Sequence, residues 1–456
     1  MIRLAHGLVA RADLPIPEWL FAWAAGMVLV VSFVALAVLW PQPRLQQRDW
    51  RPLPGGIGRA LASRPVEVLC GAIGVFLLAL TVYAGLRGEQ SPTANFAPIF
   101  IYVIFWLALV PASVLFGDVF KAFNPWRAIG RAVAGVARLG ARGELPAPLP
   151  YPEWLGRWPA AAGIFAFAAL ELVASNGDKP ENLAIATLVY SAVTFIAMAL
   201  YGVDRWIERG EAFSVYFNLF SRLSAIETRD GEVGLRRPLS GLPALSELPG
   251  TVALLAVMIG STSFDGASEK APWTSISPDL ASSFQDVGLA PQSALELAFL
   301  IGLVGSILIV AGFYRLGVLG ARSVGGDLSA RRLSNTFVHT LVPIALAYVA
   351  AHYLTLLLFQ GQALGYLASD PLGKGSDLFG TAGWQIDYGV IGANATWYWQ
   401  VGFVIAGHVA ALVLAHDRAL ALYDRAKLAV RSQYWMLAVM VGFTGLALWL
   451  LSRSST

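Results

Sequence analysis

Residues 66–86 read VEVLCGAIGVFLLALTVYAGL, an apolar stretch in which Glu67 is the one charged side chain. A helix of about 20 mostly apolar residues is long enough to cross the hydrocarbon core of a bilayer. Comparable stretches recur along the chain, so we predict about ten membrane-spanning helices. Their ranges are 18–40, 66–86, 97–117, 157–176, 182–203, 249–264, 292–314, 335–360, 395–416 and 432–452.

The segment before this stretch, 41–65, is one of five that are rich in Arg and Lys. The others are 118–157, 204–247, 315–333 and 417–431, and together the five hold 25 of the 32 basic residues. They fall in every second connection between apolar stretches. Because basic residues accumulate on the cytoplasmic side of membrane proteins, this alternation predicts a multi-pass protein of the plasma membrane with both termini outside.

The composition agrees with this class of protein, since 57% of the residues are hydrophobic and 13% are charged. We therefore predict an all-α bundle formed by residues 1–456 as a single transmembrane domain. Topology accounts for the net charge of +3, so we expect no nucleic-acid partner. The single cysteine, Cys70, excludes an intramolecular disulfide and a thiolate metal cluster. The excess of Arg over Lys, with abundant Ala and Gly, is typical of a GC-rich bacterial genome.

Four segments outside these spans have a predicted role of their own. Residues 119–139 and 205–225 combine aromatic side chains with Arg, a pattern typical of amphipathic helices in the membrane interface. We place both at the cytoplasmic surface, either as lipid anchors or as a platform for a membrane-protein partner. Residues 265–291 and 361–394 are long polar connections that we predict to form an outer cap.

Ionisable side chains inside the apolar stretches cost about 2.5–3.5 kcal/mol each, so each marks a candidate site. Five stand out: Glu171, Asp265, Glu296, His352 and His408. With the basic segments inside, three of them lie in the outer half of the bilayer. Asp265 and His408 border that half from above and below. This common depth predicts a shared chamber that opens toward the exterior.

Two imidazoles and a carboxylate suit a divalent metal, zinc above all. We predict that His352 and His408 bind the metal together with Asp265 or Glu171, and that the remaining carboxylate acts as the general base. The alternatives are a histidine that hydrogen-bonds a neighbouring helix and an Asp265 that is an ordinary turn residue. Hydroxyl groups next to Asp265 are the predicted substrate-binding groups: Ser261, Thr262 and Ser263.

Several motifs resemble a family of bacterial integral membrane proteins known as fenitrothion hydrolases. They are the leader AHGL at 5–8 with DLPIPEWLFAW at 13–23, FNPWR at 123–127, GEAFSVYF at 210–217 and GSTSFDG at 260–266. The resemblance spans nearly the whole chain. It implies hydrolysis of an organophosphorus ester, without assigning catalytic residues.

We therefore predict a membrane-embedded, metal-dependent hydrolase of lipophilic esters or phosphotriesters, which enter from the outer leaflet. Two alternatives stay open. One is a transporter or metal-handling protein that uses the same polar residues as a pathway. The other is a non-catalytic subunit or assembly factor of a membrane complex, or a homo-oligomer, that docks through its surface helices.

Overall fold

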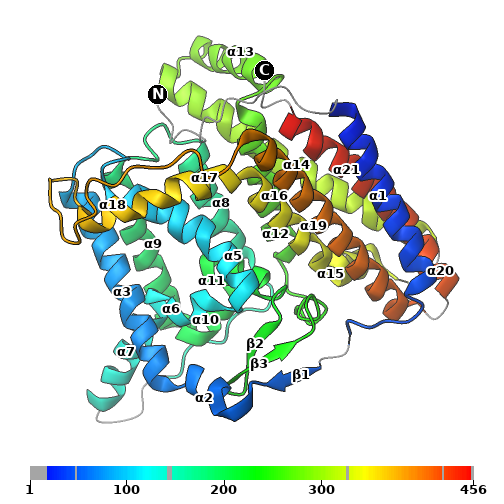
Figure 1. Ribbon diagram of the computed structural model, residues 1–456, viewed down its shortest axis with the longest axis horizontal. Coiled ribbons are helices and arrows are strands. Elements are labelled where there is room, and N and C mark those ends of the chain that lie inside the picture. Colours follow the sequence, from blue (N-terminus) through cyan, green and yellow to red (C-terminus); the bar gives the residue numbers. More distant parts are fainter. Residues whose placement is uncertain (1–17, 47–48, 141–145, 325–327, 424–425, 453–456) are drawn as a thin grey trace.

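The computed structural model describes residues 18–46, 49–140, 146–324, 328–423 and 426–452, in which long helices pack side by side as a bundle (Figure 1). The long helices are α1 (Glu18–Leu39), α3 (Arg64–Arg87), α8 (Trp158–Leu172), α9 (Pro180–Tyr201), α12 (Thr251–Ser268), α14 (Pro291–Ser323), α16 (Leu341–His352), α19 (Ala393–Leu422) and α21 (Tyr434–Ser452). A further long segment has three parts, α4 (Phe96–Ile99), the π-helix η2 (Phe100–Ala108) and α5 (Leu109–Phe116).

Shorter elements connect these helices and cover the two ends of the bundle. The α-helices among them are α2 (Ile57–Leu61), α6 (Val119–Phe123), α7 (Pro125–Gly140), α10 (Val203–Arg209), α11 (Ala212–Ser221), α13 (Trp273–Asp286), α15 (Ala330–Phe337), α17 (Leu354–Gln360), α18 (Leu364–Ser369) and α20 (Ala426–Ser432). The 3-10 turns are η1 (Pro54–Gly56), η3 (Val338–Thr340) and η4 (Gly361–Ala363).

Within the described residues, seven helical segments are long and apolar enough to cross a membrane. They are Arg64–Arg87, Phe96–Phe116, Pro180–Tyr201, Thr251–Ser268, Pro291–Ser323, Ala330–His352 and Ala393–Leu422, with shorter apolar helices at Trp23–Leu39 and Trp158–Leu172. The predicted all-α bundle of a membrane protein is confirmed at this level. The count of about ten spans remains a prediction, and so do the outward termini, which lie outside the described residues.

The basic segments gather at one end of the bundle. Figure 1 places α2, α7, α20 and a small sheet at that end, and α13 and α17 at the other. The sheet was not predicted from the sequence. It has the strand order β1-β3-β2, with every pairing antiparallel. Its strands are β1 (Trp50–Pro52), β2 (Ile226–Arg229) and β3 (Glu232–Arg236).

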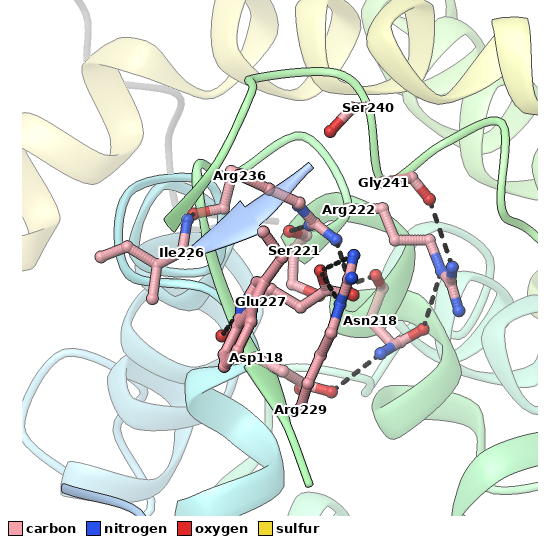
Figure 2. A network of polar contacts seen from close by, with 12 residues as sticks. Asp118, Asn218, Ser221, Arg222, Ile226, Glu227, Arg229, Arg236, Ser240 and Gly241 are labelled. Atoms are coloured by element: carbon pink, nitrogen blue, oxygen red, sulfur yellow. Dashed lines mark hydrogen bonds and ion pairs between the residues drawn. The ribbon is translucent and has the colours of Figure 1, made fainter. Parts of the chain in front are cut away.

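A network of charged side chains fastens this sheet to the bundle, as Figure 2 shows. Glu227 of β2 accepts from Arg229 at 2.7 Å and from the buried Arg236 at 3.1 Å. The Arg236 guanidinium also donates to the backbone oxygen of Ser221, at the end of α11, at 2.9 Å. Burial lowers the pKa of Arg236, and the charge of Glu227 opposes that shift.

The structure corrects the predicted surface helix at 205–225. The chain there forms two helices, α10 and α11, and α11 is covered by protein on every side. Phe213, Tyr216, Phe217 and Phe220 are at most 6% exposed, so none of them is an interfacial anchor. Polar side chains of α11 also contact protein, since Asn124 donates to the Ser214 hydroxyl and Asn218 donates to Asp118.

The other predicted surface helix, 119–139, becomes the short α6 and the longer α7. Helix α7 begins tightly against α3, where a Cβ on Gly71 would come within 2.9 Å of the Ala128 Cβ. Arg127 then pairs with Glu67 of α3 at 2.5 Å. Further along, α7 exposes a row of apolar side chains: Val133, Val136 and Leu139.

The boundary predicted near residue 264 is also corrected, because α12 continues as a helix through Asp265 to Ser268. The predicted outer connection 265–291 therefore holds the end of α12 and all of α13. Gly260 allows α12 to approach α14 closely, since a Cβ there would lie 2.6 Å from the Ile307 Cα. Small residues at helix contacts are typical of membrane bundles.

Candidate functional site

Asp265 and His352 meet where α12 and α16 end, away from the sheet. His352 Nε2 lies 2.9 Å from Asp265 Oδ2. The Asp265 side chain is 4% exposed, and that of His352 is 19% exposed. If Asp265 is ionised, its oxygen accepts from a protonated Nε2, and a neutral His352 ring then has its lone pair on Nδ1. Gly266 leaves room beside that nitrogen, because a Cβ there would stop 3.4 Å from Nδ1.

Tyr353 extends this pair toward Glu171 of α8. Its hydroxyl hydrogen-bonds to Asp265 and interacts electrostatically with the Glu171 carboxyl. The ring lies edge-on to His352, with centroids 4.6 Å apart. Asp265, His352 and Tyr353 thus form one polar cluster, in which the Tyr353 side chain is buried.

Two further phenols lie near Glu171, Tyr102 of η2 and Tyr216 of α11. The Tyr102 hydroxyl donates to Gly177 O at 2.7 Å, so its proton is committed to the backbone. Tyr216 is fully buried, and its ring stacks on Trp106 with centroids 4.4 Å apart. The Tyr216 hydroxyl interacts with Glu171 and with Tyr353, but within the described part of the chain it has no hydrogen-bond partner.

Tyr102, Tyr216 and Tyr353 were missed by the analysis of the sequence. Phenols are common in apolar helices, so they carry no signal comparable to that of a buried carboxylate. One usable signal was the position of Tyr353 directly after His352. The π-helix that carries Tyr102 and Trp106 is visible only in the structure, and such helices are rare and frequent at functional sites.

The predicted substrate-binding hydroxyls bond within their own helix. Ser261 and Thr262 donate to Met258 O at 3.4 Å and 3.2 Å. Ser263 donates to Ile259 O at 2.8 Å. Such bonds back to the preceding turn are the usual state of Ser and Thr inside helices. These three residues lie just before Asp265 in the chain, and their hydroxyl protons are already donated to backbone carbonyls of α12.

His408 lies on α19, and its side chain is fully buried. Its Nδ1 faces Val404 O at 2.7 Å, and its ring centroid is 6.4 Å from that of Tyr348. Its Nε2 has no hydrogen-bond partner among the described residues. Among all residues that the structure describes, no group of three or more His, Cys, Asp or Glu side chains is placed to hold a metal ion. The predicted metal centre of His352, His408 and Asp265 stays a prediction.

A second buried carboxylate, Glu211, explains why two of the quoted motifs belong together. Glu211 caps α11 by accepting from the backbone of Phe213 at 3.0 Å and of Ser214 at 2.8 Å. It also accepts from Asn124 Nδ2 at 3.1 Å and from the Tyr190 hydroxyl. Burial raises the pKa of Glu211, and these hydrogen bonds oppose the shift. FNPWR and GEAFSVYF therefore meet as one structural joint.

In comparisons with protein-family models, with curated proteins and with solved structures, nothing matches this chain. The resemblance to the fenitrothion hydrolases stays a prediction. The transporter and assembly-factor alternatives also stay predictions.

Proposed function

We propose that this protein is a membrane-embedded hydrolase of lipophilic esters or phosphotriesters, with His352 as its general base. The observation that carries the proposal is the 2.9 Å contact between His352 Nε2 and the buried Asp265. A carboxylate at one imidazole nitrogen fixes the ring and its tautomer, and the other nitrogen can then take a proton from a nucleophile. The proposed nucleophile is water beside Nδ1, in the space that Gly266 leaves.

The proposed reaction needs one base and one acid. Water forms a bond to the carbon or phosphorus of the ester while His352 takes one of its protons. The bond from that centre to the leaving oxygen breaks, and Glu171, in its acid form, donates a proton to this oxygen. The products are an acid and an alcohol, and exchange with solvent returns both side chains to their starting states.

The surroundings of the cluster support a neutral, lipophilic substrate. Asp265 and Glu171 lie on helices α12 and α8, both apolar enough to sit in a bilayer. An apolar ester dissolved in the bilayer would reach the site between helices, without crossing the polar end of the bundle.

The test uses the full chain in lipid nanodiscs with a long-chain aryl ester and with an aryl phosphotriester. We expect His352→Gln to lose hydrolysis by about 100-fold or more. The matched control is His416→Gln, which removes a buried imidazole that bonds Trp40 O at 3.1 Å at the far end of α19. It should keep hydrolysis. Unchanged activity in His352→Gln would remove the proposal.

The metal-dependent form of this proposal makes a separate prediction. If His352, His408 and Asp265 hold a divalent cation such as zinc, a chelator and His408→Gln both abolish hydrolysis. If His352 acts as the base without a metal, both leave it intact. Elemental analysis of the purified protein tells the two forms apart without relying on activity.

A further inference from the structure

A cavity between the helices α12, α14, α16 and α21 has no role in the proposed reaction. It holds about 550 Å³ of space, part of which is open to the outside. Ligand pockets in proteins hold about 300–1,000 Å³, so the space is large enough for a ligand. Apolar side chains from all four helices line it, among them Ile259, Val310, Ile344, Met440 and Phe443.

The cavity offers a ligand no free hydrogen-bond donor. Two hydroxyl groups lie in its lining, and both donate to backbone oxygens. Tyr314 donates to Ser334 O at 2.5 Å, and Thr340 donates to Phe337 O at 2.8 Å. None of the described residues that line the cavity carries a charge. A polar ligand would lose its hydrogen bonds to water on entry, so the cavity suits a hydrocarbon group.

The surroundings of the cavity supply such a group. Helices α12, α14 and α16 belong to segments that are long and apolar enough to cross a membrane. The outer side of α14 exposes Leu308 and Ile309, which precede the lining residue Val310 and are 64% and 55% exposed. In a bilayer these side chains meet lipid tails, which are as apolar as they are. The nearest source of hydrocarbon is therefore the acyl chains of the lipids.

The cavity lies toward the end of the bundle where the basic segments gather. Its lining includes Leu341, which begins α16, and Met436, near the start of α21. Helix α20 lies at the same end (Figure 1) and packs against α14. Arg315 of α14 and Lys427 and Arg431 of α20 are exposed there. Basic residues near a membrane surface attract anionic lipids by about 1 kcal/mol each, so the charge favours an anionic head group outside the cavity.

We propose that this cavity binds one acyl chain of an anionic phospholipid from the leaflet at the basic end of the bundle. The head group stays outside, near Arg315 and Arg431, and the chain fills the space between the helices. The flexible side chains of Met436 and Met440 suit this role, because they adapt to a chain of variable shape. The residues that line the cavity are distinct from the Asp265–His352 pair. The inference is therefore independent of the proposed hydrolase function.

The test uses the full chain in nanodiscs that contain phosphatidylglycerol with a photoreactive diazirine near the end of one acyl chain. Irradiation joins the chain to the side chains that it touches, and mass spectrometry of the peptides locates them. We expect label on Met440 and Phe443, which are 7% and 8% exposed and so are shielded from lipid around the bundle. Label confined to exposed side chains such as Leu308 and Ile309 would overturn the proposal.

The same diazirine on phosphatidylcholine tests the choice of an anionic lipid. We expect label on Met440 to fall at least about threefold, because the net charge of the head group is lost. Equal label from the two lipids would overturn that choice.

Gly317 offers a variant that fills the cavity. A Cβ there would meet Met436 Cγ at 3.7 Å, an ordinary contact, so a side chain enters without moving the backbone. Gly317→Leu should reduce label on Met440 at least about fivefold, because it occupies the space of the chain. The matched control is Gly312→Leu, which adds the same side chain to α14 where a Cβ meets nothing within 4 Å. It should keep the label.

Equal label on Met440 in Gly317→Leu and in the wild type would place the chain outside the cavity and overturn the proposal. Tryptophan fluorescence shows whether each variant is folded. The labelling pattern of the wild type decides the proposal even if Gly317→Leu does not fold.

Discussion

Replacement of Glu211 by Ala tests the buried joint that positions α11. The carboxylate accepts from four donors: Phe213 N, Ser214 N, Asn124 Nδ2 and the Tyr190 hydroxyl. All of these atoms lie in or against the core around α11, where water cannot replace the lost acceptor. The substitution therefore leaves several donors unpaired at once.

The expected cost follows from counting those donors. Each buried donor without an acceptor costs about 1–3 kcal/mol. Four of them give a loss on the order of 4 kcal/mol or more, even at the low end of that range. Ordinary substitutions cost about 0.5–3 kcal/mol, so Glu211→Ala should stand clearly outside that distribution.

The measurement is denaturant unfolding of the full chain in mixed micelles, followed by tryptophan fluorescence. Glu208→Ala serves as the control, because Glu208 is only three residues earlier, is 71% exposed and pairs with Arg205 at 3.7 Å. An exposed pair of this kind contributes about 0–1 kcal/mol. If Glu211→Ala destabilised the protein no more than Glu208→Ala does, the joint would not exist as described.

Three further predictions follow from the same contacts. Asp265→Asn should lower kcat by about 100-fold or more while the unfolding temperature changes little, since the amide no longer fixes the His352 tautomer; equal kcat values would contradict this. Gly266→Leu should block the space beside Nδ1, where even a Cβ comes within 3.4 Å, and Gly266→Ala should retain most of the activity; a fully active Leu variant would show that the nucleophile enters elsewhere. Burial raises the pKa of Glu211. Its favourable contribution to the free energy of unfolding is therefore complete at low pH and is lost as the pH rises through the raised pKa. The difference in free energy of unfolding between the wild type and Glu211→Gln should shrink with rising pH. A difference that grows with pH would mean that the pKa of Glu211 is lowered.

Hydropathy and charge predicted the helical bundle because both are properties of single segments. An apolar stretch such as 66–86 needs no partner to be recognised, and α3 forms there. The sheet could not be predicted in this way, because Trp50 of β1 pairs with Arg236 of β3, far along the chain. Strands this short leave no alternation of polar and apolar residues to detect.

The misplacement of α11 has a different origin. The helix is amphipathic, with Ser214, Asn218 and Ser221 on one face and its aromatic and aliphatic residues elsewhere. An amphipathic pattern does not tell whether the apolar face meets lipid or protein, and in α11 it meets protein. The cap at Glu211 could not be predicted, because Glu is not a usual N-cap residue and its burial depends on Asn124 and Tyr190 from other helices.

Common depth was the one argument from sequence that reached across helices. It placed His352 in the outer half of the bilayer and Asp265 at the border of that half, and the structure brings these two side chains into contact although they lie far apart in the chain. Depth alone could not predict the contacts of His408, because depth says nothing about the direction in which a helix faces. His408 faces its own backbone at Val404 and the ring of Tyr348.

The choice between an orienting pair and an ordinary helix contact depends on what surrounds the Asp265–His352 pair. A carboxylate and an imidazole that only joined α12 to α16 would need no third group, and an apolar pair would join them at lower cost. Here the buried carboxylate also has the hydroxyl of the buried Tyr353 as a hydrogen-bond partner. Burying so many polar groups inside an apolar bundle is costly, and residues of this kind in membrane proteins mark functional sites.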